Sequence, residues 1–197
     1  MENFFKKVTK DVDLSFDILL SFCVYVFFSL NIEIFFSHNI SFAILERFAV
    51  LGLVGLALTI CIIAGEIDLS IGSNAALCAV IVVKLTDPLG APFAMLIGLS
   101  VSTLIGAIQG FVIAFIRIRA IVITVGTLML LRGVALLIAE EKTVMLTDFR
   151  VPDFITTKVL MYFSPASLTV IFIFICVGIF MRYTKYGREI YSIGGAR

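Results

Sequence analysis

Residues 65–73 read GEIDLSIGS and separate two long apolar stretches, ILERFAVLGLVGLALTICIIA before them and NAALCAVIVVKL after them. Two carboxylates, Glu66 and Asp68, therefore stand between segments whose composition suits lipid. We expect an inter-helix turn here, because Gly65 and Gly72 free the backbone and Asp68 or Ser70 can cap the first N–H groups of the following helix. A contact with a partner subunit, or a gate, is the functional alternative.

The composition of the whole chain sets its class. Of 197 residues, 61% are hydrophobic and 15% are charged, and the mean hydropathy is +1.15. Because globular domains carry about 25% charged residues, these values indicate a membrane protein. The formal net charge of +1 argues against a nucleic-acid partner, since such binding needs an excess of Lys and Arg to neutralise phosphates.

Six apolar stretches are suited to span a membrane as helices, since about 20 residues cross a hydrocarbon core of about 30 Å. Their unbroken apolar runs lack the alternation of a barrel strand. The predicted fold class is all-α, a polytopic transmembrane helix bundle. The predicted spans are 18–36, 44–64, 71–85, 92–116, 121–139 and 165–181.

Basic residues near the ends of these spans predict the orientation of the chain. With the N-terminus inside, the inner face would receive nine of the fifteen basic residues. They are Lys6, Lys7, Lys10, Arg117, Arg119, Arg182, Lys185, Arg188 and Arg197. We therefore expect 1–17 and 182–197 to be cytoplasmic and 18–181 to form the membrane region.

The sequence offers no enzyme chemistry and no cofactor site. One histidine, His38, cannot make a metal cluster or a catalytic triad, and no G-x-x-x-x-G-K-[ST] nucleotide motif occurs. The four cysteines lie in apolar spans without C-x-x-C spacing, which favours packing over metal binding. We expect a passage or a scaffold whose driving chemistry lies on another subunit.

Small residues recur every four positions in the fourth predicted span. They are Gly98, Ser102, Gly106, Gly110 and Ala114. Such a ridge lets another helix approach closely, so we expect it to pack. Gln109 in the same span either bonds to a neighbouring helix or lines a polar path, and packing is favoured.

Arg132 lies in the middle of the fifth predicted span, where facing lipid would cost at least about 2.5 kcal/mol. We expect it to face protein, water or an interface. A helix break at Gly126 or Gly133 would leave carbonyl oxygens for its guanidinium, and Thr124 and Thr127 lie nearby. Structural pairing is favoured over contact with a substrate.

Several stretches, in order, resemble one known family. GEIDLSIGS is similar to the G-x-I-D-L-S-x-G-S segment of bacterial ABC-transporter permeases for monosaccharides, the branch that includes ribose, arabinose, xylose and autoinducer-2 importers. GAIQGFVIAFIRIRAIVITVGTLMLLRG resembles the family's G-x-x-x-G helix, basic turn and T-x-G-T-x-x-x-x-R-G segment. The family signature and gating candidates are Glu66, Asp68, Ser70, Gly72, Thr124, Gly126, Thr127 and Arg132.

The last stretch, YTKYGREIYSIGGAR, resembles the family segment T-x-x-G-R-x-x-x-x-x-G-G-N, which leads into the cytoplasmic coupling helix. The resemblance implies contact with an ATPase for this segment, and a basic interfacial anchor with a glycine turn is the alternative. The candidates for that contact are Thr184, Gly187, Arg188, Gly194 and Gly195. The family fold would have about ten spans, so we expect a fragment, a truncated product or half of a split permease.

The resemblance implies the permease subunit of an ATP-driven importer for a monosaccharide or related sugar-like solute, in the bacterial inner membrane. Its implied partners are a cytoplasmic ABC ATPase, a periplasmic sugar-binding protein and a second permease chain, in a homo- or heterodimer. Which sugar is carried stays open, as does an inactive truncated remnant or a structural partner of a full-length permease. A secondary transporter is less favoured, because the chain shows no internal repeat.

Overall fold

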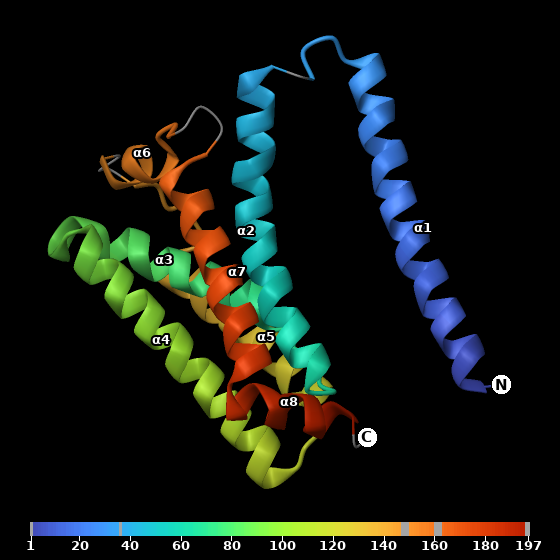
Figure 1. Cartoon of the computed structure of the whole chain (residues 1–197). Helices are drawn as coiled ribbons and strands as arrows, with labels where there is room; N and C mark the ends of the chain where they lie inside the picture. The colour runs from blue at the N-terminus through green and yellow to red at the C-terminus, as the bar shows by residue number, and fades with distance from the viewer. Residues whose placement is uncertain (1, 36, 147–149, 160–162, 196–197) are drawn as a thin grey trace.

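The computed structural model describes residues 2–35, 37–146, 150–159 and 163–195. These residues form eight α-helices and one π-helical segment, with a single isolated bridge between Val159 and Phe163. The elements are α1 (Glu2–Asn31), α2 (His38–Ile63), α3 (Ile71–Leu89), α4 (Ala91–Phe111), η1 (Val112–Ile116), α5 (Ala120–Ile138), α6 (Arg150–Thr156), α7 (Pro165–Tyr183) and α8 (Lys185–Gly195). The predicted all-α class is confirmed (Figure 1).

Five helical stretches of the described chain are long and apolar enough to cross a membrane: α2, α3, α4 with η1, α5 and α7. They match five of the six predicted spans, with small differences at the ends. The helix α2 begins earlier than predicted, because the Ser37 side chain accepts a hydrogen bond from Ile40 N and caps it. The first predicted span forms part of α1, but that helix ends at Asn31, and its apolar part, Ile18–Asn31, is shorter than predicted.

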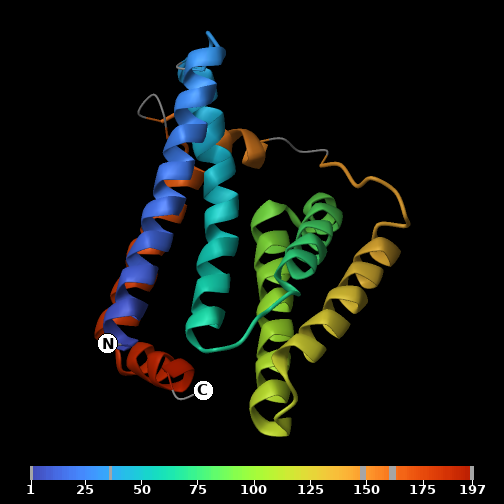
Figure 2. The same cartoon turned by 90° about the vertical axis from the view of Figure 1, so that its right-hand side faces the viewer.

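The long helices pack as two groups. One group joins α3 to α4 and α5, and the other joins α2 to α7 and α8. Figure 2 shows the groups side by side, with residues 64–70 crossing from the end of α2 to the start of α3. The helix α1 stands apart from both groups in Figure 1. Two stretches of chain therefore join the groups: residues 64–70, and the stretch from α5 to α7 that contains α6.

Apolar packing inside the first group centres on α3 and α5. Leu77 of α3 forms a buried cluster with Leu131 and Ala135 of α5. These residues are almost fully removed from solvent, whereas most large apolar side chains on the outer helix faces are exposed. Such an outward apolar surface suits lipid rather than water.

Both ends of the chain lie at the same end of the bundle as the turn after η1 (Figure 1). The helix α8 lies across that end, beside the last turn of α7 (Figure 1). The three segments that the basic residues predicted to share one side of the membrane are thus together at one end.

The small-residue ridge of α4 packs at one end only. A Cβ atom at Gly98 would lie 2.7 Å from Val82 Cγ2 and 3.1 Å from Cys78 Sγ of α3, so a larger residue does not fit. A Cβ at Gly106 or Gly110 would meet nothing within 4 Å. The reason is that α3 begins only at Ile71, so it runs beside the first part of α4 and leaves the rest of the ridge uncovered.

Gly98→Leu is expected to destabilise the chain by about 1–3 kcal/mol, because overpacking forces α4 away from α3. Gly106→Leu is the matched control, since the same change at that position meets open space. Unfolding of each purified variant in detergent micelles, followed by the loss of helical circular dichroism, measures the difference. Equal destabilisation by both changes would contradict the observed packing.

Candidate functional site

The helix α2 ends in a turn, after which residues 64–70 run to α3 without helical structure. Glu66 N donates to Cys61 O at 3.0 Å and Gly65 N donates to Ile62 O at 2.9 Å, which is the pattern of a Schellman motif. Gly65 has φ +80°, a conformation that glycine adopts without steric cost. The predicted inter-helix turn is therefore confirmed, and its cause is the glycine at the helix end.

Asp68 holds the next part of this segment in place. Its Oδ1 accepts hydrogen bonds from Ser70 N at 2.8 Å and from Ser70 Oγ at 2.7 Å. Ser70 occupies the N-cap position of α3, yet its side chain makes no capping hydrogen bond. The prediction that Asp68 or Ser70 caps the free N–H groups of α3 is therefore wrong. Asp68 accepts from Ser70 instead, and the Ser70 hydroxyl bonds to Asp68 and to Gln109 of α4.

Ser70 joins this segment to α4. Gln109 Nε2 donates to Ser70 Oγ at 2.9 Å, and both side chains are buried, with Ser70 only 1% exposed. Thr124 of α5, 2% exposed, places its hydroxyl 3.4 Å from Ile67 O. We call Asp68, Ser70, Gln109 and Thr124 the Ser70 network. The structure thus brings three of the predicted signature residues together, and it adds Gln109 as a bond to a neighbouring element.

A second polar contact lies beside this network, one turn into α3. Asn74 Nδ2 donates to Ser102 O of α4 at 3.3 Å. The Asn74 Oδ1 and Ser102 Oγ atoms are buried without a hydrogen-bond partner among the described residues. This part of the α3–α4 contact is therefore more polar than ordinary packing requires.

An open groove of about 560 Å³ runs between α3 and α5. Small side chains of one α3 face form one wall, and the facing side of α5 forms the other. Its lining includes Leu69, Gly72, Ser73, Ala76, Ala79, Leu128, Arg132, Ala135, Leu136 and Lys142. We call it the α3–α5 groove. Gly72, Ser73, Ala76 and Ala79 have the spacing of one helix face. This pattern is visible in the sequence, but we did not identify it there.

Arg132 lines this groove with an exposed side chain. The helix α5 continues unbroken through Gly126 and Gly133, so the predicted helix break is absent. None of the described residues forms an ion pair or hydrogen bond with the Arg132 guanidinium. The predicted structural pairing is therefore not seen, and Arg132 faces the groove.

The remaining signature residues lie outside the Ser70 network. Thr127 Oγ1 donates to Ile123 O of its own helix at 2.8 Å. Gly126 is exposed, and a Cβ there would meet nothing within 4 Å. Glu66 is half-buried just beyond α2. The spacing of the motif residues in the sequence did not show which of them would join the Ser70 network and which would not.

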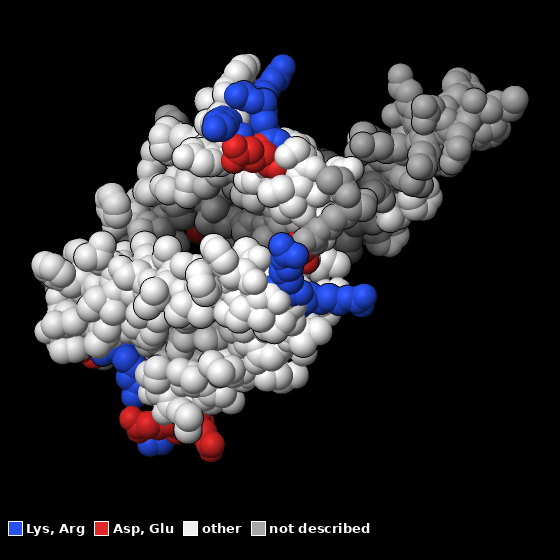
Figure 3. Space-filling model, turned by 90° about the horizontal axis from the view of Figure 1, so that it is seen from below, with Lys and Arg blue, Asp and Glu red and all other residues white. Residues whose placement is uncertain are grey.

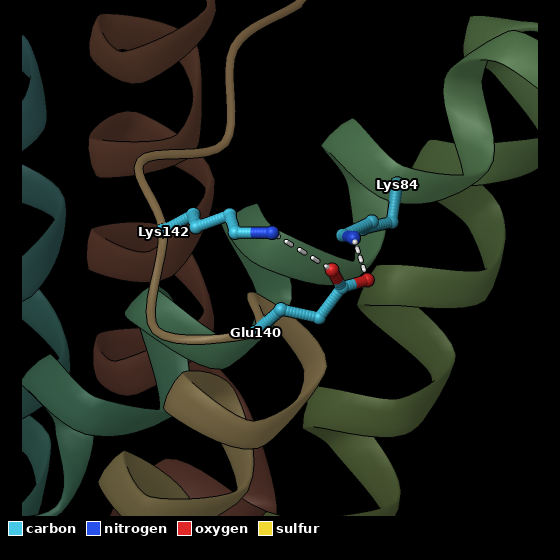
Figure 4. A network of polar contacts seen from close by, with 3 residues as sticks. All are labelled: Lys84, Glu140 and Lys142. Atoms are coloured by element: carbon cyan, nitrogen blue, oxygen red, sulfur yellow. Dashed lines mark hydrogen bonds and ion pairs between the residues drawn. The ribbon is translucent and has the colours of Figure 1, made fainter.

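Charged side chains join α3 to the end of α5 beside the groove (Figure 4). Lys84 Nζ lies 3.1 Å from Glu140 Oε1, and Lys142 Nζ lies 3.6 Å from Glu140 Oε2. The hydrogen bond and positive charge of Lys84, with a further bond from Lys142, lower the pKa of the Glu140 carboxyl. Glu140 therefore stays ionised at neutral pH and neutralises part of the charge there.

The end of the chain contacts the end of α2 closely. Thr184 Oγ1 accepts a hydrogen bond from Gly187 N at 3.1 Å, which begins α8. A Cβ at Gly187 would overlap the Met181 carbonyl, and one at Gly194 would overlap the Ile63 carbonyl. These two glycines of the last motif therefore allow α8 to fold back and rest on the final residue of α2.

Within the described ranges, no three His, Cys, Asp or Glu side chains gather where they could hold a metal ion. Seen from the end where the termini lie, the charged side chains form separate groups on an otherwise uncharged surface (Figure 3). The described residues thus provide two positively charged side chains, Arg132 and Lys142, in the α3–α5 groove, and the hydrogen-bonded Ser70 network near it.

Comparison with known proteins places these features in one family. Residues 40–197 match the family described as branched-chain amino acid transport system / permease component. The chain is 32% identical to the autoinducer 2 import system permease protein LsrC of Enterobacter sp. (strain 638) over 146 residues, covering 74% of this chain and 42% of that protein. It is 30% identical to the D-allose transport system permease protein AlsC of Escherichia coli (strain K12) over 181 residues, covering 90% and 55%.

A further relative is the inner membrane ABC transporter permease protein YjfF of Escherichia coli (strain K12), 29% identical over 174 residues, which cover 82% of this chain and 50% of that protein. The chain thus spans about half the length of the curated relatives it matches. No solved structure matches it. The matched family consists of transport components rather than enzymes, and the chain is a multi-pass membrane protein.

Ser70→Ala is expected to lower the free energy of unfolding by about 1–3 kcal/mol, because it leaves the buried Gln109 amide without its acceptor. Ser73→Ala is the control, since that hydroxyl donates only to Ser70 O one turn earlier and is half-buried. Unfolding of the purified chain by SDS in mixed micelles provides the measurement.

A double-mutant cycle makes this test specific. If Ser70 and Gln109 act together, Ser70→Ala with Gln109→Leu costs less than the sum of the two single changes. Additive costs would show that the hydrogen bond between α4 and the non-helical segment contributes nothing of its own.

Proposed function

Because this chain belongs to the family of branched-chain amino acid transport system permease components, we propose that it is the membrane-spanning permease subunit of an ATP-driven importer. The solute is a monosaccharide or a related sugar-like molecule. Relatives named for D-allose transport and autoinducer 2 import support this class. The observation that carries the proposal is the α3–α5 groove, which holds an arginine where a membrane helix would normally present an apolar side chain.

The α3–α5 groove lines the solute path in this proposal. Arg132 offers up to five N–H donors to the hydroxyl oxygens of a sugar, and the Ser73 oxygen, whose proton is donated to Ser70 O, can accept from a sugar hydroxyl. The small side chains of Gly72, Ala76 and Ala79 leave room beside them. A second permease chain, identical or related, completes the path from the open side of the groove.

The segment from Thr184 to Gly195 meets the cytoplasmic ABC ATPase. Movement of α8 reaches Ile63 through Gly194, because the two backbones are in direct contact. Ile63 leads directly into residues 64–70, which the Ser70 network ties to α4 and α5. The gating residues Glu66, Asp68, Ser70 and Thr124 thus lie on a continuous route from the ATPase to the groove, the kind of two-state element that gating requires.

The N-terminus lies in the cytoplasm of a bacterial cell and the membrane is the inner one. The basic residues Arg117, Arg119, Arg182, Lys185 and Arg188 support this orientation, because they all flank the ends of spans on one side. A periplasmic sugar-binding protein delivers the solute at the opposite end, near Lys84 and Glu140.

Co-purification tests the importer proposal. The tagged chain, solubilised gently from membranes of its own cells, is expected to bring with it an ATPase and a solute-binding protein that mass spectrometry identifies. Gly194→Ala is expected to lower recovery of the ATPase about tenfold, since the added Cβ forces α8 off Ile63. Gly195→Ala is the control, because a Cβ at that position meets nothing within 4 Å.

Each contrary outcome has a distinct meaning. Recovery of neither protein, from a chain shown to be inserted, would contradict the importer proposal and favour an inactive remnant. If the unaltered chain recovers the ATPase but both glycine variants lower this recovery equally, the importer proposal stands. The contact between α8 and α2 would then be rejected as the route from the ATPase to the groove.

The α3–α5 groove is expected to be open to water. In a chain whose native cysteines are replaced by serine, Ser73→Cys and Ala76→Cys should react with a charged, membrane-impermeant thiol reagent at least about tenfold faster than Ala107→Cys, because thiolates form only where water reaches them. Ala107 is the control, as it is exposed on α4 outside the groove. Equal, slow labelling at all three positions would exclude the groove as a solute path.

A further inference from the structure

A second groove, of about 680 Å³, lies between α2, α7 and α8, at the end of the molecule where both termini lie. Its walls are apolar and come from two helices that cross the membrane region. Leu56 and Ile60 line it from α2, and Phe174, Val177 and Gly178 line it from α7. We call it the α2–α7 groove. It is separate from the α3–α5 groove, and the two share none of their lining residues.

Two arginines from different helices stand at the mouth of this groove. Arg182 belongs to the last turn of α7 and Arg188 belongs to α8, and Tyr191 lies one turn after Arg188. Arg188 Nη1 donates to Tyr183 O at 3.3 Å, and the Arg182 guanidinium lies 5.6 Å from the centre of the Tyr183 ring. Both cations are therefore held near the groove by contacts with the same residue.

No carboxylate lines the α2–α7 groove among the described residues. Glu189, the acidic residue of α8, lies 4.0 Å from Lys185 instead. The two arginines thus form a positive mouth on an apolar groove, at the end of the helices where lipid headgroups meet the protein. This combination is complementary to a molecule that has an anionic head and an apolar tail.

We propose that the α2–α7 groove binds an anionic phospholipid, whose phosphate lies between Arg182 and Arg188 and whose acyl chain lies along α2 and α7. Tyr191 adds a hydroxyl at the level of the headgroup. Basic pockets between membrane helices on the cytoplasmic side recognise such headgroups.

The walls of the groove favour an acyl chain over a polar solute. Thr59, the polar side chain of the α2 wall, already donates its hydroxyl to Gly55 O at 2.7 Å. A sugar or a peptide placed there would lose its hydrogen bonds to water and find few replacements. Gly178 contributes width, because a Cβ there would meet nothing within 4 Å.

A lipid in this position would hold α8 against α2 and α7. The inference goes beyond the importer proposal, since binding requires neither an ATPase nor a sugar. It stands or fails on the purified chain alone.

Native mass spectrometry of the purified full chain, in mixed micelles with equal phosphatidylglycerol and phosphatidylethanolamine, tests the proposal. The unaltered chain is expected to retain phosphatidylglycerol about tenfold in preference to phosphatidylethanolamine. Arg182→Gln with Arg188→Gln should abolish the preference. Arg117→Gln with Arg119→Gln is the matched control and should keep it, because it removes the same charge at the same end of the molecule on the other helix group.

A second variant keeps both arginines and fills the groove. Gly178→Leu should reduce lipid retention to the level of the double arginine variant, and circular dichroism shows whether it remains folded. The proposal is overturned if phosphatidylethanolamine is retained equally, if the control pair reduces the preference as much as the groove pair, or if millimolar inorganic phosphate displaces the lipid completely.

Discussion

The hydrogen bond from Gln109 Nε2 to Ser70 Oγ holds the non-helical segment between α2 and α3 against α4. In an apolar bundle, every polar group of a non-helical segment must find its partner inside the protein. Residues 64–70 meet this requirement through the turn at Gly65, the bonds from Ser70 to Asp68, and the Gln109 and Thr124 side chains. Because this segment leads from α2 into α3, the same bonds fix where the chain from the second group enters the first.

Much of this fold follows from the sequence, because apolar length is a local property. The ranges of α3, α5 and α7 were predicted closely, and the turn at 65–73 was predicted from its polar composition. The Ser70–Gln109 bond was not predictable, since 39 positions separate the partners and neither residue type prescribes a distant one. The expected break in α5 failed for a physical reason: Leu131 and Ala135 pack continuously against Leu77, and this packing keeps the helix straight past Gly133.

The glycines show why a motif does not by itself identify the role of its residues. Gly65 supplies a backbone conformation with positive φ, whereas Gly194 permits a close approach between α8 and the carbonyl of Ile63. Gly72 does neither, and its missing side chain widens the α3–α5 groove. Sequence alone marks all three as points of backbone freedom. Only the packing in the structure shows that Gly65 forms a turn, Gly194 a close contact and Gly72 part of a groove wall.

The strength of the Ser70 network fits the gating role that we propose for residues 64–70. Each neutral hydrogen bond contributes only about 0.5–1.5 kcal/mol net, so the few bonds between this segment and α4 and α5 amount to a few kcal/mol. Reversing a two-state equilibrium from 1:99 to 99:1 requires about 5.5 kcal/mol of differential binding. A network of this size holds residues 64–70 in one position, yet it is weak enough for a partner that acts on α8 to shift it. A continuous apolar contact, such as the one between Leu77 and Leu131, would instead hold α3 and α5 together through the change. The polar link between rigidly packed helices is therefore the place where movement costs least.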